Sequence, residues 1–147
     1  MENQFVVKKD ILIQGSPSAV WDALTNPEKT KEYFFNCEVL SDWEVGSQIT
    51  FKGRVFLFKK IELEGTILDI EPGRLLKYTL HNNDDYRESS FSTITDELTI
   101  ENGAVRLAVT DDVGQGQGAE ERYQRSVKGW DKVLKGLKEL VEAESQN

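Results

Sequence analysis

The chain has 147 residues, of which 18 are basic and 26 are acidic, so that its formal net charge is −8. A chain of this length can bury one sizeable core without disulfides. Hydrophobic residues make up 38% and charged residues 30%, which excludes wholesale disorder, collagen and a membrane-spanning bundle. We expect a single domain over residues 1–147, with an ordered core of about residues 5–143.

Charge and cysteine content limit the partners and the compartment. The acidic balance repels phosphate backbones, and the longest basic runs are the pairs Lys8–Lys9 and Lys59–Lys60, so nucleic-acid binding is not expected. One cysteine, Cys37, and one histidine, His81, cannot form an internal disulfide or a dedicated zinc site. Because no signal peptide or membrane span is apparent, we expect a cytoplasmic protein with no metal and no other cofactor.

The first third of the chain predicts a strand and two short helices. Apolar residues alternate over residues 5–13, as in a half-buried strand. Ser16-Pro17 and Asn26-Pro27 each combine an N-cap side chain with a proline at the first helical position, which is typical of a helix start. The second helix is expected to end near residues 33–35.

The middle of the chain, from about residue 38 to residue 112, alternates with a period of two and predicts an antiparallel meander. Glu71-Pro72-Gly73-Arg74 suits a type II turn, and Asn102-Gly103 is a strong hairpin signal. Residues 81–85 are expected to form a polar loop. A run of apolar residues, Val55–Phe58, leaves two alternatives: a strand buried on both faces, or an exposed tip beside a cavity mouth or in a dimer contact.

The last segment, from about Ala119 to Ala143, predicts a long one-faced helix. Six apolar side chains fall within an arc of roughly 80°: Tyr123, Val127, Trp130, Leu134, Leu137 and Val141. The helix is roughly 37 Å long, enough to cross a seven-stranded sheet roughly 34 Å wide. The sequence therefore predicts an α+β helix-grip fold, in which a curved antiparallel sheet of about six to seven strands wraps around this helix and Trp130 points inward.

This order of elements resembles the helix-grip fold of the START-like or SRPBCC superfamily, which includes the Bet v allergens and polyketide cyclases. Four parts of the chain are similar to the activator of heat-shock-protein-90 ATPase homologue-like family: residues 13–29, Ser41–Ser47, Gly65–Pro72 with Leu75–Tyr78, and Gly129-Trp130. The resemblance covers about residues 8–140 and implies a fold with a cavity. Many relatives place a histidine four residues before the helix tryptophan, where this chain has Ser126, so the resemblance does not imply chemistry that uses that histidine.

Several other motifs favour structural roles. Gly114–Ala119 matches G-x-G-x-x-A, but a dinucleotide-binding unit needs a further strand after the helix. A flexible connection into the last helix is favoured, and its mobility would let the helix lift to admit a ligand. His81 is expected in a solvated loop, and Cys37 has no basic neighbour to activate it. The acidic pairs Asp84–Asp85 and Glu120–Glu121 are expected to be solvated.

The leading hypothesis is a non-enzymatic binding module with an apolar cavity between the last helix and the sheet, for a small hydrophobic molecule. No catalytic residue is assigned. Large side chains of the sheet and the helix are the expected cavity lining: Trp43, Phe51, Tyr78, Tyr123, Val127, Trp130 and Leu134. Each aromatic residue among them is equally compatible with a packed core.

Two alternatives remain open. A cyclase or hydrolase would need a titratable group facing the cavity, such as Glu62, Glu64 or Arg87, yet the alternation puts both glutamates opposite Ile61 and Leu63. A chaperone-regulating partner with a role in stress responses is suggested by the family name alone. A homodimer is a further alternative for the partner.

Overall fold

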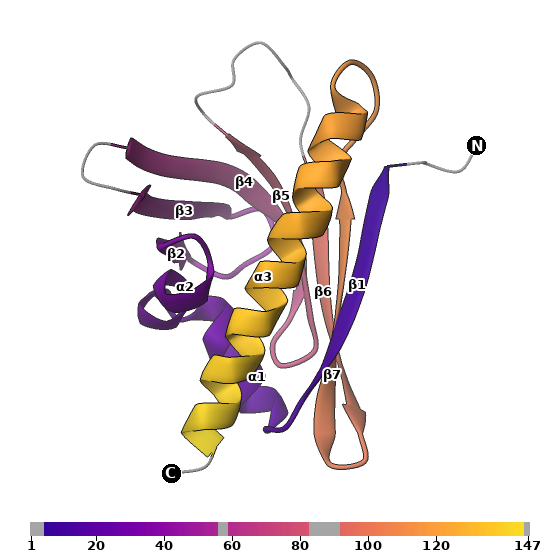
Figure 1. The fold of residues 1–147 in the computed structure, drawn as a ribbon. Coiled ribbons are helices and arrows are strands. Elements are labelled where there is room, and N and C mark those ends of the chain that lie inside the picture. Colours follow the sequence, from indigo (N-terminus) through magenta and orange to yellow (C-terminus); the bar gives the residue numbers. More distant parts are fainter. Residues whose placement is uncertain (1–4, 56–58, 83–91, 146–147) are drawn as a thin grey trace.

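The computed structural model describes residues 5–55, 59–82 and 92–145. The elements follow one another as a strand, two short helices, six strands and a long helix (Figure 1). They are β1 (Val6–Ile13), α1 (Pro17–Thr25), α2 (Pro27–Tyr33), β2 (Cys37–Ser41), β3 (Gln48–Val55), β4 (Lys59–Glu71), β5 (Leu75–Asn82), β6 (Ser92–Glu101), β7 (Ala104–Asp112) and α3 (Ala119–Ser145).

The strands of the described residues form one seven-stranded antiparallel sheet in the order β1-β7-β6-β5-β4-β3-β2. Strands β2 to β7 form a meander, whereas β1 pairs with β7. The first two strands of the chain therefore lie at opposite edges of the sheet, and α1 and α2 make the connection between them. This sheet, the long C-terminal helix and the two short helices after β1 confirm the predicted helix-grip fold.

The two short helices begin where the capping signals predict. The Ser16 side chain accepts a hydrogen bond from the Ala19 N–H at 3.1 Å, and Asn26 accepts one from the Glu28 N–H at 3.0 Å. The Asn26 N–H also donates to the Asp22 carbonyl at 2.8 Å, so one residue ends α1 and starts α2. A proline follows each N-cap, where its missing N–H costs nothing.

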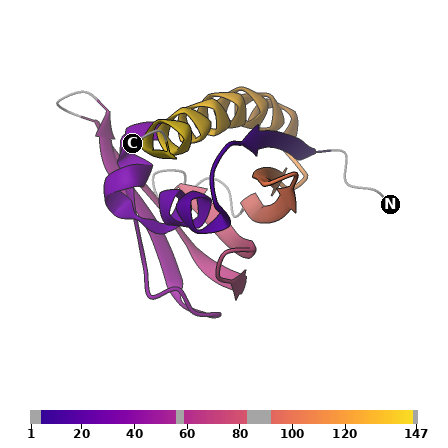
Figure 2. The ribbon, with the colours of Figure 1, turned by 90° about the horizontal axis from the view of Figure 1, so that it is seen from below.

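The sheet curves strongly, and α3 lies across its concave side (Figure 2). Two glycines permit close approach of neighbouring backbone. A Cβ atom at Gly65 of β4 would overlap the Thr79 carbonyl of β5, and one at Gly53 of β3 would overlap the Asn36 carbonyl. Only glycine fits where backbone approaches this closely, so these positions allow the curvature that makes room for the helix.

The apolar face of α3 is buried as the sequence predicts, most completely in its C-terminal half. Trp130 is 8% exposed and points inward. Tyr123 and Val127, nearer the start of the helix, are half-buried. The fully packed positions of the helix are Val133, Leu134, Leu137 and Val141.

Polar contacts hold α3 against β1 and the segment that follows it. Lys9 forms an ion pair with Asp131 at 3.0 Å. The Lys138 ammonium donates to the Leu12 carbonyl at 2.6 Å, and Glu142 accepts from the Gln14 N–H at 2.8 Å. These contacts are distributed along the C-terminal half of the helix, which is therefore the anchored part.

The structure differs from the sequence predictions at one end of β5. The strand runs through His81 to Asn82, although residues 81–85 were expected to be a loop. His81 pairs with Glu64 of β4 and is half-buried, because the ladder continues past the last apolar residue of the strand. The two alternatives for the apolar run Val55–Phe58, a buried strand or an exposed tip, stay predictions. Residues 56–58 and the Val55 side chain lie outside what the structure describes.

Candidate functional site

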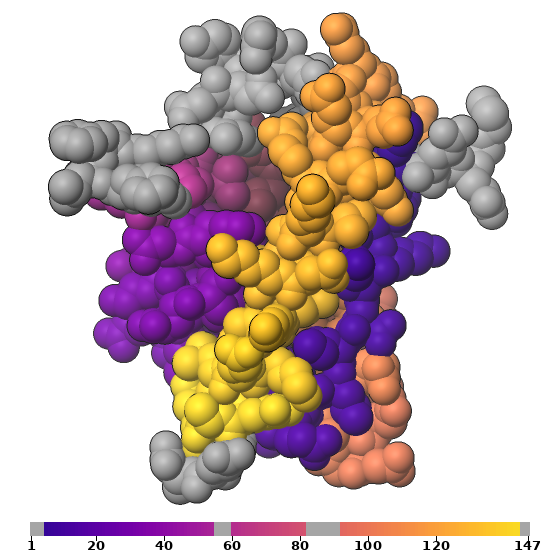
Figure 3. Space-filling model, in the orientation of Figure 1, coloured from indigo at the N-terminus to yellow at the C-terminus, as the bar shows by residue number. Residues whose placement is uncertain are grey.

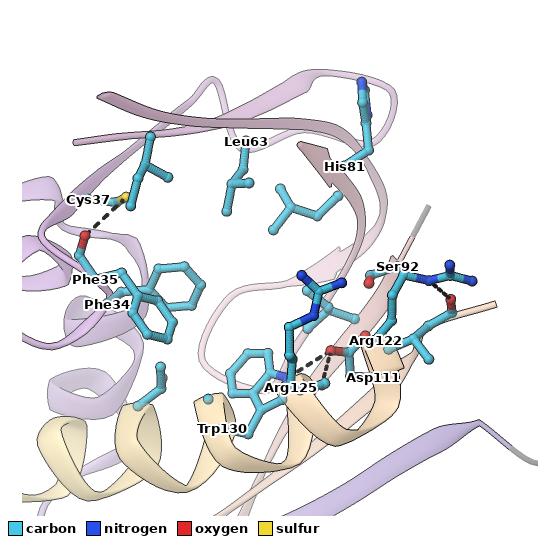
Figure 4. A pocket seen from close by; sticks show the side chains of 17 residues that line it. Phe34, Phe35, Cys37, Leu63, His81, Ser92, Asp111, Arg122, Arg125 and Trp130 are labelled. Carbon is cyan, nitrogen blue, oxygen red and sulfur yellow. Dashed lines mark hydrogen bonds between the residues drawn. The ribbon is translucent and has the colours of Figure 1, made fainter. Parts of the chain in front are cut away.

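The main pocket is a cavity of about 550 Å³ between α3 and strands β4 to β7 (Figure 4). In the space-filling view, α3 runs diagonally over the front of the molecule, with β4 and β5 behind and beside its upper half (Figure 3). The end of α2 and the start of β2 complete the wall. Most of the lining is apolar. The apolar part includes Phe34, Phe35, Ile61, Leu63, Leu80, Ile94, Val113 and Val133.

A layer of four aromatic rings closes the inner end of the main pocket. Phe34 stacks on Phe51 with ring centroids 4.6 Å apart and meets Trp130 edge-on at 6.1 Å. Phe51 lies 6.0 Å from Tyr78. Beneath this layer is a much smaller inner cavity of about 20 Å³, lined among others by Tyr33, Tyr78 and Leu134. The aromatic layer therefore separates the open pocket from the packed core.

One end of the main pocket is polar and is built around Asp111 of β7. Its Oδ2 accepts hydrogen bonds from the Ser126 hydroxyl at 2.6 Å and from the Trp130 indole N–H at 2.9 Å. Asp111 is only 5% exposed. Its Oδ1 is buried and has no hydrogen-bond partner among the described residues, which is costly for a carboxyl oxygen.

The alternation of β7 explains why this carboxyl group points inward. Val105, Leu107 and Val109 are buried on the inner face of the strand, and Asp111 is the next residue of the same parity. The apolar series continues at Val113, which is also buried. An acid therefore occupies one position of an apolar row, and this break in the row is the sequence signal for the polar end of the pocket.

A second acid, Asp96, interrupts the inner row of the adjacent strand β6 in the same way. It lies between Ile94 and Leu98 in that row, is 2% exposed, and lines the inner cavity. Its Oδ1 has no partner among the described residues. Burial raises the pKa of Asp96 from 3.8 to about 7, and the negative charge of Asp111 is the second cause.

Two arginines at the start of α3 lie beside the polar end. Arg122 donates to the Val113 carbonyl at 3.1 Å and to the Gln117 carbonyl at 3.0 Å, and so braces the glycine-rich connection at residues 114–118. Arg125 is exposed, lines the main pocket, and makes no ion pair with the described residues. Figure 4 shows its side chain rising from α3 into the pocket.

Of the seven residues that the sequence proposed as ligand-cavity lining, the structure places four beside the main pocket or the inner cavity. Trp130 lines both the main pocket and the inner cavity. Phe51, Tyr78 and Leu134 line the inner cavity, on the core side of the aromatic layer.

The other three lie outside both cavities. Tyr123 meets Phe5 edge-on at 6.1 Å, on the side of α3 that faces β1. Val127 is half-buried and packs against the core. Trp43 is also half-buried against the core, and its φ of 60° places it in a left-handed turn after β2.

The pocket faces a flank of α3 that the sequence argument did not single out. Ser126, Gly129 and Val133 line it, and their helical positions lie next to the apolar stripe rather than within it. The small residues at positions 126, 129 and 136 were the sequence signal that could have located this flank. Gly136 leaves room for Tyr33, since a Cβ there would lie 2.8 Å from the Tyr33 Cβ.

Cys37 and His81 also line the main pocket, although neither was expected to do so. Burial raises the pKa of the Cys37 thiol to about 11, so the thiol stays protonated at neutral pH and unreactive. His81 lies at the end of β5, on a different part of the wall from Asp111 (Figure 4). Within the described parts of the chain, no group of three or more His, Cys, Asp or Glu side chains is placed to hold a metal ion.

The fold and the position of the pocket define a helix-grip domain of the START-like kind. The family model described as Activator of Hsp90 ATPase homolog 1-like protein matches residues 14–142. The chain belongs to this family. Among curated proteins, none matches the chain.

Solved structures agree with the family and the fold. ChR145 from Cytophaga hutchinsonii is 30% identical, with each chain covered completely and a TM-score of 0.78. Two more distant structures support the fold alone. CV1439 from Chromobacterium violaceum is 22% identical, with 94% of this chain and 97% of that chain covered and a TM-score of 0.77. NE0264 from Nitrosomonas europaea is 17% identical, with both chains fully covered and a TM-score of 0.78. Across the residues described, no helix is both long and apolar enough to cross a membrane.

Proposed function

We propose that the protein is a binding module that holds a small, largely apolar molecule in the main pocket and performs no chemistry on it. The observation that carries this proposal is the pocket itself. Its volume of about 550 Å³ lies within the roughly 300–1,000 Å³ that small-molecule sites occupy. Its largely apolar walls and its small number of polar side chains also match the usual composition of such sites.

The layout of the pocket supports binding of a molecule with an apolar body and one polar end. Ile61, Leu63 and Leu80 would cover the body and remove it from water, which is favourable in proportion to the apolar area buried. The cluster of Asp111, Ser126 and Trp130 would orient the polar end. The side chain of Glu62 points away from the wall that Ile61 and Leu63 form, and Arg87 lies outside the described residues. The titratable Asp111 and His81 do line the pocket, but they lie on different parts of its wall (Figure 4).

Filling the pocket from α3 tests the proposal. A Cβ added at Gly129 would lie 3.5 Å from the Phe35 ring, which is ordinary contact, so Gly129→Leu places an isobutyl group inside the pocket. We expect the affinity for 2-naphthol, a small aromatic alcohol, to fall at least tenfold in isothermal titration calorimetry. Helix stability should not suffer, because leucine is better than glycine by close to ~1 kcal/mol inside a helix.

A matched control is Gln124→Leu, which adds a leucine to the same helix at an exposed position outside the pocket. It is expected to bind 2-naphthol as the wild type does. Equal affinity of Gly129→Leu and the wild type would contradict binding of the probe against this face of α3, since the introduced side chain takes up that part of the pocket. Thermal unfolding of all three proteins establishes that each is folded under the titration conditions.

The proposal includes the cytoplasm as the compartment and one domain over the whole chain, as expected from the sequence. The chaperone-regulating alternative rests on the family name alone. It predicts that the folded protein captures a heat-shock chaperone from cell lysate and raises its ATPase rate. A homodimer would show as a doubled mass in analytical ultracentrifugation.

A further inference from the structure

We propose that the ligand of the main pocket is an amphipathic anion, with an apolar body and a carboxylate that binds the guanidinium group of Arg125. This inference rests on the proposed function, because it assigns the chemical class of the molecule that the pocket would hold. It is carried by the basic side chains at the start of α3, which line the pocket of an otherwise acidic protein.

The first step concerns charge. Over the whole chain, 26 acidic residues outnumber 18 basic ones. Among the described residues of the pocket lining the balance is reversed, because two arginines, Arg122 and Arg125, stand against one acid, Asp111. The arginines are three residues apart on α3 and are therefore neighbours on the surface of the helix. A hollow with such a charge raises the local concentration of anions.

The second step concerns Asp111, the acid of this lining. Its Oδ2 accepts hydrogen bonds from Ser126 at 2.6 Å and from Trp130 at 2.9 Å. Its Oδ1 is buried. Both oxygens are therefore withdrawn from a molecule in the pocket, and an anionic group that approaches the start of α3 does not meet an open carboxyl edge.

The third step separates the two arginines. Arg122 donates to the carbonyl groups of Val113 at 3.1 Å and Gln117 at 3.0 Å, which fixes its guanidinium group against the connection that precedes α3. The guanidinium group of Arg125 has no hydrogen bond or ion pair with the residues that the structure describes, and its side chain extends into the pocket (Figure 4). Arg122 therefore contributes charge, whereas Arg125 offers a fork of N–H donors that matches a carboxylate.

The fourth step concerns the strength of this contact. Arg125 is exposed, and an ion pair between exposed side chains is weak because water screens it. A bound ligand changes these surroundings, since its apolar body displaces water from the side of the guanidinium group that faces the pocket, and attraction between charges is stronger where water is excluded. The contribution to affinity is therefore expected to lie between that of an exposed ion pair and that of a buried hydrogen bond to a charged group, at about fivefold to tenfold.

Two matched probes measure this contribution. 2-Naphthoate carries a carboxylate at neutral pH, and 2-naphthamide has nearly the same shape without the charge. We expect the wild-type protein to bind 2-naphthoate about fivefold to tenfold more tightly in isothermal titration calorimetry at about 0.15 M salt. The preference should shrink at about 1 M salt, because screening then weakens the ion pair, whereas the affinity for 2-naphthamide should change little.

Two variants of Arg125 assign the preference to its side chain. Arg125→Gln removes the charge and is expected to bind the two probes with equal affinity. Arg125→Lys keeps the charge but loses the fork of donors, so its preference should be intermediate. Because Arg125 is exposed, both variants are expected to fold, and thermal unfolding checks this.

A matched control is Lys132→Gln, which removes the same charge from an exposed position of α3 outside the pocket. Seven residues of helix place it roughly 10 Å from Arg125 along the axis. This exceeds the Debye length of about 8 Å at 0.15 M salt, so the control should keep the wild-type preference.

The outcomes separate this inference from the proposed function. If the wild type binds 2-naphthoate and 2-naphthamide with equal affinity, the pocket holds ligands without selecting anions, and the inference is wrong while the proposed function stands. A preference that persists in Arg125→Gln would also overturn the inference, because another group would then hold the carboxylate. If neither probe nor 2-naphthol binds the wild type, the proposed function fails and the inference fails with it.

Discussion

Replacing Asp96 with asparagine is expected to stabilise the protein above pH 7 by several kcal/mol, although it removes a charge from the centre of the sheet. Asp96 is buried, and its Oδ1 has no partner among the described residues. The neutral amide of asparagine is close in size and polarity to the protonated acid. The variant therefore resembles the wild type at low pH and avoids the cost of burying a charge at high pH.

The direction of the pH dependence follows from the two pKa values. The pKa of Asp96 is raised to about 7 in the fold from an ordinary value of 3.8, so the folded protein holds a proton that the unfolded chain has released. The contribution of this group to stability is fully present below about pH 4 and is lost as the pH rises through 7. One pKa unit corresponds to about 1.4 kcal/mol, so the full loss is on the order of 4 kcal/mol.

Urea unfolding of the wild type and Asp96→Asn at a series of pH values from 5 to 8.5 measures this effect. The stability difference should grow with pH and level off above 7. Glu97→Gln is the matched control, because Glu97 is the next residue of β6 and is exposed on the opposite face. A difference that is independent of pH, or an Asp96→Asn variant less stable than the wild type at pH 8.5, would contradict the account.

The second large effect is expected at Trp130. The change Trp130→Ala removes a buried indole from the junction of the aromatic layer, α3 and the polar end of the main pocket. Truncation of a buried aromatic residue costs about 3–5 kcal/mol, and Asp111 also loses one of its two donors. We therefore expect a loss at the upper end of that range, with a lower urea midpoint and weaker 2-naphthol binding.

The variant Trp130→Phe divides this loss into its two parts. It keeps an aromatic ring against Phe34 and removes the indole N–H that Asp111 accepts. Loss of one partner of a buried hydrogen bond costs about 1–3 kcal/mol. A Trp130→Phe, Asp111→Asn double-mutant cycle isolates the coupling between the two side chains. Trp43→Phe, at a half-buried tryptophan outside both cavities, is the control. Stability of Trp130→Ala within about 1 kcal/mol of the wild type would contradict an inward, structural Trp130.

The elements of the fold were predictable because their signals are local. Ser16 and Asn26 cap helices through hydrogen bonds within three residues, and alternation identifies strands without knowledge of their neighbours. The apolar stripe of α3 predicted its buried face, including Trp130. The extension of β5 to His81 was not predictable in the same way, because the pairing of His81 with Glu64 is a long-range contact.

The position of the main pocket depends on how the elements pack, and this is why the sequence located it imperfectly. The apolar stripe of α3 marks where the helix packs most tightly, whereas an open pocket faces the flank that carries Ser126 and Gly129. Asp96 and Asp111 were visible as acids within apolar rows. Their proximity, however, follows from the pairing of β6 with β7, in which Asp96 lies opposite Val109 and Ile94 opposite Asp111.

The most direct test of the central claim is an NMR experiment on methyl-labelled protein saturated with 2-naphthol. We expect intermolecular nuclear Overhauser effects from the naphthyl protons to the methyl groups of Ile61, Leu63 and Leu80, which line the main pocket. The Trp130 indole N–H resonance should shift in the same titration. Overhauser effects confined to the exposed methyl groups of Val45 and Ile100, with the pocket methyl groups unaffected, would contradict the claim that this pocket is the binding site.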